Sequence, residues 1–232
     1  MKRILLIILL NLICLIGYSQ SIEKYDYIID MKYYKSYYCE DIQTSSFIIY
    51  KMYKGGGDVS RSGLNFKVYN KLPHFNYTNS GYDRGHLVPA EDMAYSQKSI
   101  QSTFYYINAI PQNPTLNRSI WKQYEDYIRD FSQTDSIIII CGGCDYKDLI
   151  PEKCFKLVYN LRTRRCIYSI LFYNDNSRMI IYNDPKLKQK IPFKIDVIFN
   201  AFNVFILSPL YFIIPHRRLG VNSYYLSNVE RV

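Results

Sequence analysis

Apolar and β-branched residues gather in short runs that are separated by Gly, Pro and Asn along much of the chain. Runs of this length and composition, bounded by turn residues, predict β-strands. The expected strands cover Ser45 to Tyr53, Leu64 to Tyr69, Phe104 to Ile110, Ser136 to Cys141, Cys154 to Leu161 and Cys166 to Tyr173. The stretch from Asn70 to Tyr82 contains Pro73 and many polar residues, and it predicts a loop.

One segment has the period of a helix instead. From Leu116 to Phe131, apolar residues recur at spacings of three and four, and this predicts an amphipathic helix with Thr115 as its N-cap. The expected apolar stripe consists of Ile120, Trp121, Tyr124, Ile128 and Phe131. A helix among several strands predicts an α+β domain around an antiparallel sheet, and 232 residues suffice for one such domain.

The first nineteen residues have the pattern of a secretory signal peptide. Lys2 and Arg3 precede an almost entirely apolar run from Ile4 to Ile16, and Gly17 and Ser19 can occupy the small-residue positions before a cleavage site. The run is short for a membrane span. We therefore expect a signal peptide over residues 1–19, a mature domain over residues 20–232, and a secreted or periplasmic protein. An uncleaved N-terminal anchor is the alternative.

A second apolar stretch runs from Val197 to Ile214 near the other end of the chain. Its length is close to that of a membrane span, but Asn200, Asn203 and Pro209 interrupt it. Polar residues and helix breakers of this kind are costly in lipid. A buried helix and strand is the preferred interpretation, and a membrane-associated segment is the alternative.

The formal net charge is +9, which suits a polyanionic partner such as nucleic acid or an anionic membrane surface. Five cysteines follow the expected signal peptide: Cys39, Cys141, Cys144, Cys154 and Cys166. In an exported chain some of them should be paired, although the sequence does not give the connectivity. The Cys141 to Cys144 spacing is that of a redox or zinc motif, but no second CxxC or nearby His completes a zinc site. We expect a structural role.

The densest polar cluster is Asp83-Arg84-Gly85-His86, which apolar residues flank. A neutral His can take a proton from water near pH 7, and a carboxylate can orient its ring. Arg can contact a phosphate through two hydrogen bonds, and Gly permits a close backbone approach. The cluster therefore indicates phosphodiester chemistry. A loop with a salt bridge and an ordinary His is the alternative interpretation.

A second polar segment begins at Asn108 and continues into the expected helix. Asn117, Trp121, Glu125 and Arg129 are spaced by four residues, so they form a slowly winding ridge beside the apolar stripe. A core helix with a surface Glu–Arg pair would explain the last two residues. It would not explain Asn117 or the entry to the helix, which is rich in Asn, Gln and Pro.

Together the two segments resemble the DNA/RNA non-specific endonuclease family, the ββα-metal nucleases that include the Serratia nuclease and mitochondrial endonuclease G. The resemblance covers Tyr82 to Arg129 and extends to the strands near Tyr173. It implies an antiparallel sheet core with a ββα-metal catalytic motif. It also implies an endonuclease that hydrolyses DNA and RNA at their phosphate backbone, independently of sequence, and leaves 5′-phosphate ends.

The same resemblance implies a role for each site residue. His86 would be the general base, and Asn117 would be the single protein ligand of Mg²⁺, or of Mn²⁺ in its place. Glu125 would hold metal-bound waters. Asp83 would be a supporting carboxylate, Arg84 and Arg129 would stabilise charge on the phosphate, and Asn108 would orient His86 or Asn117.

Three other functions compete with this interpretation. One is a catalytically inactive nucleic-acid-binding protein, and another is a membrane-tethered envelope protein that uses residues 197–214. The third is a small-molecule metallophosphoesterase, which usually needs several His and Asp ligands, whereas His74 and His216 lack such surroundings. We expect DNA and RNA as partners, no small-molecule cofactor, and a homodimer as one possible assembly.

Overall fold

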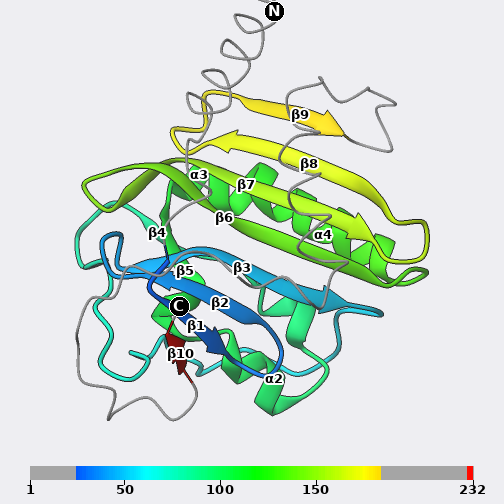
Figure 1. Ribbon diagram of the computed structural model, residues 1–232, viewed down its shortest axis with the longest axis horizontal. Coiled ribbons are helices and arrows are strands. Elements are labelled where there is room, and N and C mark those ends of the chain that lie inside the picture. Colours follow the sequence, from blue (N-terminus) through cyan, green and yellow to red (C-terminus); the bar gives the residue numbers. More distant parts are fainter. Residues whose placement is uncertain (1–24, 184–228, 232) are drawn as a thin grey trace, which may run out of the picture.

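A computed structural model describes residues 25–183 and 229–231 of the chain. Eight of the described strands form one antiparallel sheet in the order β10-β1-β2-β3-β6-β7-β8-β9 (Figure 1). Their bounds are β1 Tyr27–Asp30, β2 Lys35–Cys39, β3 Thr44–Met52, β6 Ile137–Lys147, β7 Ile150–Asn160, β8 Arg165–Tyr173, β9 Met179–Asn183 and β10 Val229–Arg231. The predicted α+β fold with an antiparallel sheet is confirmed.

The centre of the sheet is apolar because its longest strands carry most of the β-branched residues. β6 lies between β3 and β7, and Ile137 and Ile139 at its start are fully buried. They belong to the main core, which also contains Trp121 and Phe172. The four strands predicted around residues 45–53, 136–141, 154–161 and 166–173 are therefore confirmed as β3, β6, β7 and β8.

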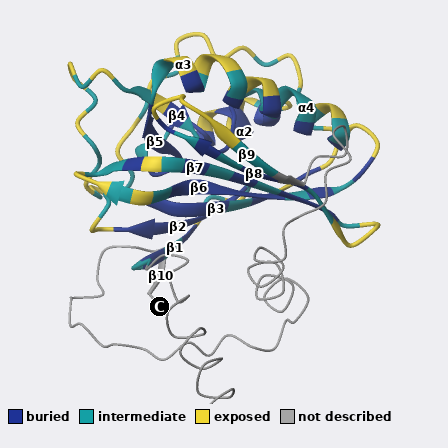
Figure 2. Cartoon of the chain, turned by 90° about the horizontal axis from the view of Figure 1, so that it is seen from above, coloured by how far each residue is buried: buried dark blue, intermediate teal, exposed yellow. Residues whose placement is uncertain are grey.

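A second layer covers one face of the sheet (Figure 2). It contains a two-stranded antiparallel pair, β4 and β5, and a helical stretch that follows β5. The bounds in this layer are β4 Asp83–His86, η1 Glu91–Met93, α2 Gln97–Ser102, η2 Tyr106–Asn108, β5 Ala109–Gln112, α3 Pro114–Leu116, η3 Asn117–Trp121 and α4 Lys122–Ser132. Trp121 and Ile128 point from the helical stretch into the main core, so the predicted apolar stripe packs the helix onto the sheet.

The helical stretch begins two residues earlier than predicted. Asn113, not Thr115, is the N-cap, and its side chain accepts hydrogen bonds from the backbone N–H groups of Thr115 and Leu116. Pro114 stands at the first helical position, where a missing N–H costs nothing. The segment Asn117–Trp121 is a π-turn between two α-helical pieces, and π-turns of this kind often occur at functional sites. The uniform 3.6-residue period expected for residues 116–131 is therefore wrong in its first turn.

Two other predicted strands are wrong in whole or in part. Leu64 to Tyr69 forms no strand, and only an isolated bridge joins Lys67 to Tyr105. Phe66 nevertheless packs against the small cluster of Ala90, Ile100 and Phe104, which explains its apolar character. Phe104 to Ile110 holds the 3₁₀ turn η2, and strand structure starts only at Ala109.

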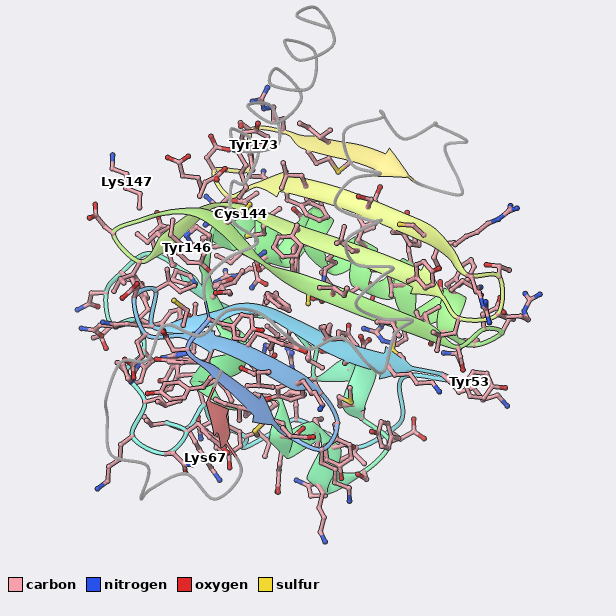
Figure 3. The ribbon with its side chains drawn as sticks, in the orientation of Figure 1. Tyr53, Lys67, Cys144, Tyr146, Lys147 and Tyr173 are labelled. Carbon is pink, nitrogen blue, oxygen red and sulfur yellow. The ribbon has the colours of Figure 1, made fainter. Side chains whose placement is uncertain are left out.

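The cysteines lie mainly in the sheet and, within the described residues, no disulfide joins them. The pairing expected of an exported chain is thus absent from this part of the molecule. Cys141 and Cys154 are fully buried in the main core, and Cys141 donates to the carbonyl oxygen of Leu87 at 3.0 Å, which supports a structural role. Figure 3 shows Cys144 with Tyr146 and Lys147 toward the end of β6, far from Tyr53.

Two expectations fall on residues that the structure does not describe. The signal peptide over residues 1–19 and the apolar stretch Val197 to Ile214 both lie outside the described residues. Among residues 25–183 and 229–231, no helix is both long enough and apolar enough to cross a membrane.

Candidate active site and metal centre

The motif Asp83-Arg84-Gly85-His86 is the strand β4. It pairs with β5 so that Asp83 lies opposite Gln112 and His86 lies opposite Ala109. Side chains alternate along a strand, so Arg84 and His86 share one face while Asp83 points to the other. Glycine is required at position 85 because there is no room for a side chain: a Cβ there would lie 2.3 Å from the Gln112 Oε1 atom.

His86 lies in an aromatic environment. Its ring centroid is 4.8 Å from that of Phe66 and 5.1 Å from that of Phe104. The Nε2 atom is buried and has no hydrogen-bond partner among the described residues, although the residue as a whole is partly exposed. Burial lowers the pKa of His86 to about 4, so the ring is neutral at pH 7 and is able to accept a proton.

An ion pair next to His86 was not predicted from the sequence. Arg61 Nη1 lies 3.0 Å from Glu91 Oε1. Glu91 acts to raise the pKa of His86 and Arg61 acts to lower it, both less strongly than burial does. Arg61 belongs to an irregular loop, where no periodicity signals its position, so sequence reasoning overlooked it.

Asn108 fixes the backbone that follows His86. The side chain is fully buried, its Oδ1 accepts from the Val88 N–H at 2.9 Å, and its Nδ2 donates to the carbonyl oxygens of Val88 and Thr103. All three of these side-chain hydrogen bonds go to backbone groups. Asn108 therefore orients the end of β4 and does so through the main chain.

Asn117 is tied to the β4 strand. Its Nδ2 atom donates to Asp83 Oδ2 at 2.9 Å, and the exposed Arg118 donates to both oxygens of the same carboxylate. Burial raises the pKa of Asp83, but the hydrogen bonds from Arg118 and Asn117 outweigh burial and hold that pKa below its usual range. Asp83 thus supports Asn117, and the described residues show no hydrogen bond between Asp83 and the ring of His86.

The donor chemistry at Asn117 fits a hard divalent cation. Because the amide nitrogen is committed to Asp83, the carbonyl oxygen is the atom that remains for a ligand. Within the described residues, no group of three or more His, Cys, Asp or Glu side chains could hold a metal. Mg²⁺ keeps several waters and needs few protein oxygens, so a site with one amide oxygen, water and substrate oxygens suits it.

Glu125 lies on α4, two turns beyond Asn117. Its side chain is only 11% exposed, and its Oε1 atom is 3.4 Å from the Nζ atom of the fully buried Lys156. Burial raises the pKa of Glu125 to about 7, and the positive charge of Lys156 is the strongest opposing influence. The sequence did not lead us to predict Lys156. The available signal is the two-residue period of β7, in which Lys156 stands between the buried residues Cys154 and Val158.

Arg129 forms ion pairs with carboxylates on two sides. Its Nε donates to Asp92 Oδ1 at 2.8 Å and its Nη1 donates to Asp126 Oδ1 at 2.9 Å. Asp92 is buried and also accepts from the Tyr50 hydroxyl at 2.9 Å. The guanidinium is therefore held in one orientation below the helix, and 19% of the side chain is exposed.

Two interactions connect the predicted site residues. A hydrogen bond joins Asn117 to Asp83 of β4, and the negative charge of Glu91 acts to raise the pKa of both His86 and Glu125. Arg84 is exposed and lies 5.5 Å from the ring of Tyr77, on the face that it shares with His86. A separate hollow of about 410 Å³ lies over the outer side of the helix and is lined by Ser119, Ile120, Lys122, Gln123 and Asp126. None of the predicted site residues lines it.

These features define a domain in which an antiparallel strand pair that carries His is joined to a helix that carries Asn and Glu. A family model described as DNA/RNA non-specific endonuclease matches residues 15–204, and the chain belongs to this family. The family predicted from the two polar segments is confirmed.

Individual relatives match over shorter stretches. Mitochondrial endonuclease G of Bos taurus is 37% identical over 93 residues, which are 38% of this chain and 31% of the relative. A nuclease of Nostoc sp. is 34% identical over 122 residues, which are 48% of this chain and 44% of the relative. The matched part thus spans less than half the length of these relatives.

A solved structure has a similar fold. A chain in the crystal structure of the EndoG/EndoGI complex, which concerns the mechanism of EndoG inhibition, superposes with a TM-score of 0.57 at 21% identity. The match covers 67% of this chain and 78% of that chain. It supports the α+β architecture with its antiparallel sheet.

Proposed function

We propose that this domain hydrolyses phosphodiester bonds of DNA and RNA independently of sequence, and that it uses one divalent metal ion, Mg²⁺ or Mn²⁺. The observation that carries the proposal is the hydrogen bond from Asn117 to Asp83. It joins the strand of His86 to the helix of Glu125 and leaves one amide oxygen for the metal. Membership of the endonuclease family supports the same activity.

Each site residue of the chain has a separate role in this reaction. His86 accepts the proton of the attacking water, because its low pKa keeps the ring neutral at pH 7. Asn117 would hold the metal through its carbonyl oxygen, and Glu125 would orient water beside it. When bound, the metal stabilises negative charge on the phosphate oxygens and on the leaving oxygen. The products are expected to carry 5′-phosphate ends.

The two arginines act differently. Arg84 is exposed and is available for a direct contact with a phosphate. Arg129 is fixed by Asp92 and Asp126, so it supplies a positive charge in a set position. Contacts with the phosphate backbone carry no sequence information, and the net charge of +9 predicts that affinity falls with rising salt.

The activity is tested with the purified chain on plasmid DNA and on a structured RNA. Both substrates should be degraded in Mg²⁺ or Mn²⁺, and EDTA should stop the reaction. End-labelling of the products should show 5′-phosphates. If the chain binds both nucleic acids but cleaves neither at any metal concentration, the proposal fails and the inactive nucleic-acid-binding protein takes its place.

We also propose that the protein is exported, with residues 1–19 as a cleaved signal peptide. Mass spectrometry of the mature protein from its native host should find Gln20 at the N-terminus. An intact N-terminus in the membrane fraction would favour an anchored envelope protein instead, and light scattering would distinguish a homodimer from a monomer.

A further inference from the structure

Lys156 is a fully buried lysine in the middle of the sheet. It lies on β7 between Cys154 and Val158, both of which face the same core, and its side chain is 1% exposed. The Nζ atom lies 3.8 Å from the centroid of the Trp121 ring. An ammonium group is costly to bury unless a counter-charge and a fixed environment compensate for its lost hydration.

The counter-charge of Lys156 is Glu125. Its Oε1 atom lies 3.4 Å from Nζ, and Lys156 is the partner that most strongly opposes the effect of burial on this carboxyl group. Arg129, the other cation near Glu125, already pairs with Asp92 and Asp126. Among the described residues, Lys156 is thus the cation in direct contact with Glu125.

The Trp121 ring determines where the ammonium group lies. Trp121 is fully buried and packs edge-on against Phe172 at a centroid distance of 5.2 Å. A cation above an indole face is attracted by the ring quadrupole. The buried Trp121 ring therefore holds Nζ on the core side of Glu125. Because Lys156 approaches the Oε1 atom from the core, the other carboxylate oxygen is left for the partly exposed side of Glu125.

We propose that Lys156 is a positioning residue that favours the ionised form of Glu125 and aims its second oxygen at water beside Asn117. The inference rests on the proposed function, because that function gives Glu125 its task. The charged groups that face Glu125 are Lys156 from β7, Glu91 and Asp92 from the η1 turn, and Arg129 from its own helix. Two further titratable groups, Tyr50 of β3 and Cys141 of β6, also lie within its electrostatic reach. Without Lys156, two acidic neighbours and burial would favour the protonated carboxyl group.

The test uses the full chain and three variants: Lys156→Met, Glu125→Gln, and the double variant. Methionine keeps an unbranched apolar side chain of nearly the length of lysine, without its charge. Loss of one partner of a buried pair can unfold a domain, whereas the double variant buries no unpaired charge. Circular dichroism establishes that each variant is folded before the other measurements are compared.

The first readout needs no activity. Carbon-detected NMR of the metal-free protein follows the Glu125 carboxyl through a pH titration, with Glu125→Gln used to assign its signal. Lys156→Met should raise the pKa of Glu125 by about one unit or more, because an opposite charge at this distance lowers the pKa of a carboxyl group by a comparable amount. An unchanged Glu125 titration would overturn the proposal, whether or not the chain cleaves nucleic acid.

The second readout is the pH profile of kcat/KM for DNA cleavage. At pH 7, Lys156→Met should lose about 10–100-fold, and the loss should shrink as rising pH ionises Glu125. The double variant should be no slower than Glu125→Gln alone, since Lys156 acts through Glu125. A loss that is equal at every pH, and that adds to the effect of Glu125→Gln, would identify a merely structural lysine. If the wild type itself does not cleave, the proposed function fails while the NMR result still decides the pairing.

Discussion

Asn117 donates its side-chain N–H to Asp83 at 2.9 Å, and this bond ties the π-turn of the helix to the β4 strand. The backbone of Asp83 is paired with Gln112 of β5, and Arg118 donates to both oxygens of its carboxylate. The bond also decides which atom of Asn117 remains for a cation. One carboxylate therefore aligns the helix and orients the amide.

Breaking this bond should weaken the metal site. Asp83→Ala should lower activity at limiting Mg²⁺ by about 10–100-fold, because partners of a metal ligand typically contribute this much, and high Mg²⁺ should restore part of the loss. Arg118→Ala is the matched control, since it removes the other partner of Asp83. The Arg118 side chain is 71% exposed, and ion pairs with an exposed partner contribute little. Cleavage rates across a Mg²⁺ titration give the comparison. Equal effects of the two substitutions would show that Asp83 does not act through Asn117.

His86→Ala should abolish most of the activity. A general base typically contributes about 10²–10⁴-fold, so kcat should fall by that factor while DNA affinity stays close to that of the wild type. His74→Phe is a suitable control, because it keeps the stack on Tyr106 at 3.8 Å and removes an imidazole from the same region. Single-turnover cleavage and a filter-binding assay separate the two effects. Wild-type rates in His86→Ala would refute its role as the base.

The acidic limb of the pH profile should follow Glu125 and not His86. The pKa of Glu125 is raised to about 7 by burial, whereas that of His86 is lowered to about 4. At limiting Mg²⁺, kcat/KM should therefore rise as pH increases through about 7 and level off at higher pH. Glu125→Gln should be slower and should lack this limb. A limb near pH 7 that survives in Glu125→Gln would assign the titration to another group.

Protein stability should report the same titration with the opposite trend. The pKa of Glu125 in the folded protein lies above its pKa in the unfolded chain. The stability that this difference contributes is fully present below the unfolded pKa and is lost as pH rises through about 7. Glutamine does not titrate. Relative to the wild type, the melting temperature of Glu125→Gln should therefore rise as the pH increases from 5 to 8. A pH series of thermal melts in the absence of metal measures this difference.

Much of the fold could be predicted from local patterns, because β-branched runs and an amphipathic stripe report burial directly. The central strands and the helix over Leu116 to Phe131 follow from such patterns. The strand predicted over Leu64 to Tyr69 is wrong. Phe66 in this run packs against the cluster of Ala90, Ile100 and Phe104 from a loop, and a short apolar run does not distinguish such a loop from a strand.

The candidate site was partly predictable for a related reason. His86, Asn117 and Glu125 lie in two segments whose polar residues have no role in the apolar core, so they stand out in the sequence. Lys156 and Arg61 act from other parts of the chain, and only the tertiary structure brings them to Glu125 and Glu91. Charged residues of this kind resemble solvated surface charges until burial is known.

Gly85→Ala should destabilise the domain, because the new methyl group would meet the Gln112 side chain at 2.3–3.0 Å inside a buried pair of strands. Overpacking of this kind costs about 1–3 kcal/mol, and each kcal/mol lowers the melting temperature of a domain of this size by about 2–4 °C. The three atoms nearest to the new methyl group all belong to the side chain of Gln112. The double variant Gly85→Ala/Gln112→Gly should therefore lose less stability than the sum of the single variants, as measured by urea denaturation. Additive losses would mean that the clash with Gln112 is not the cause of the lost stability.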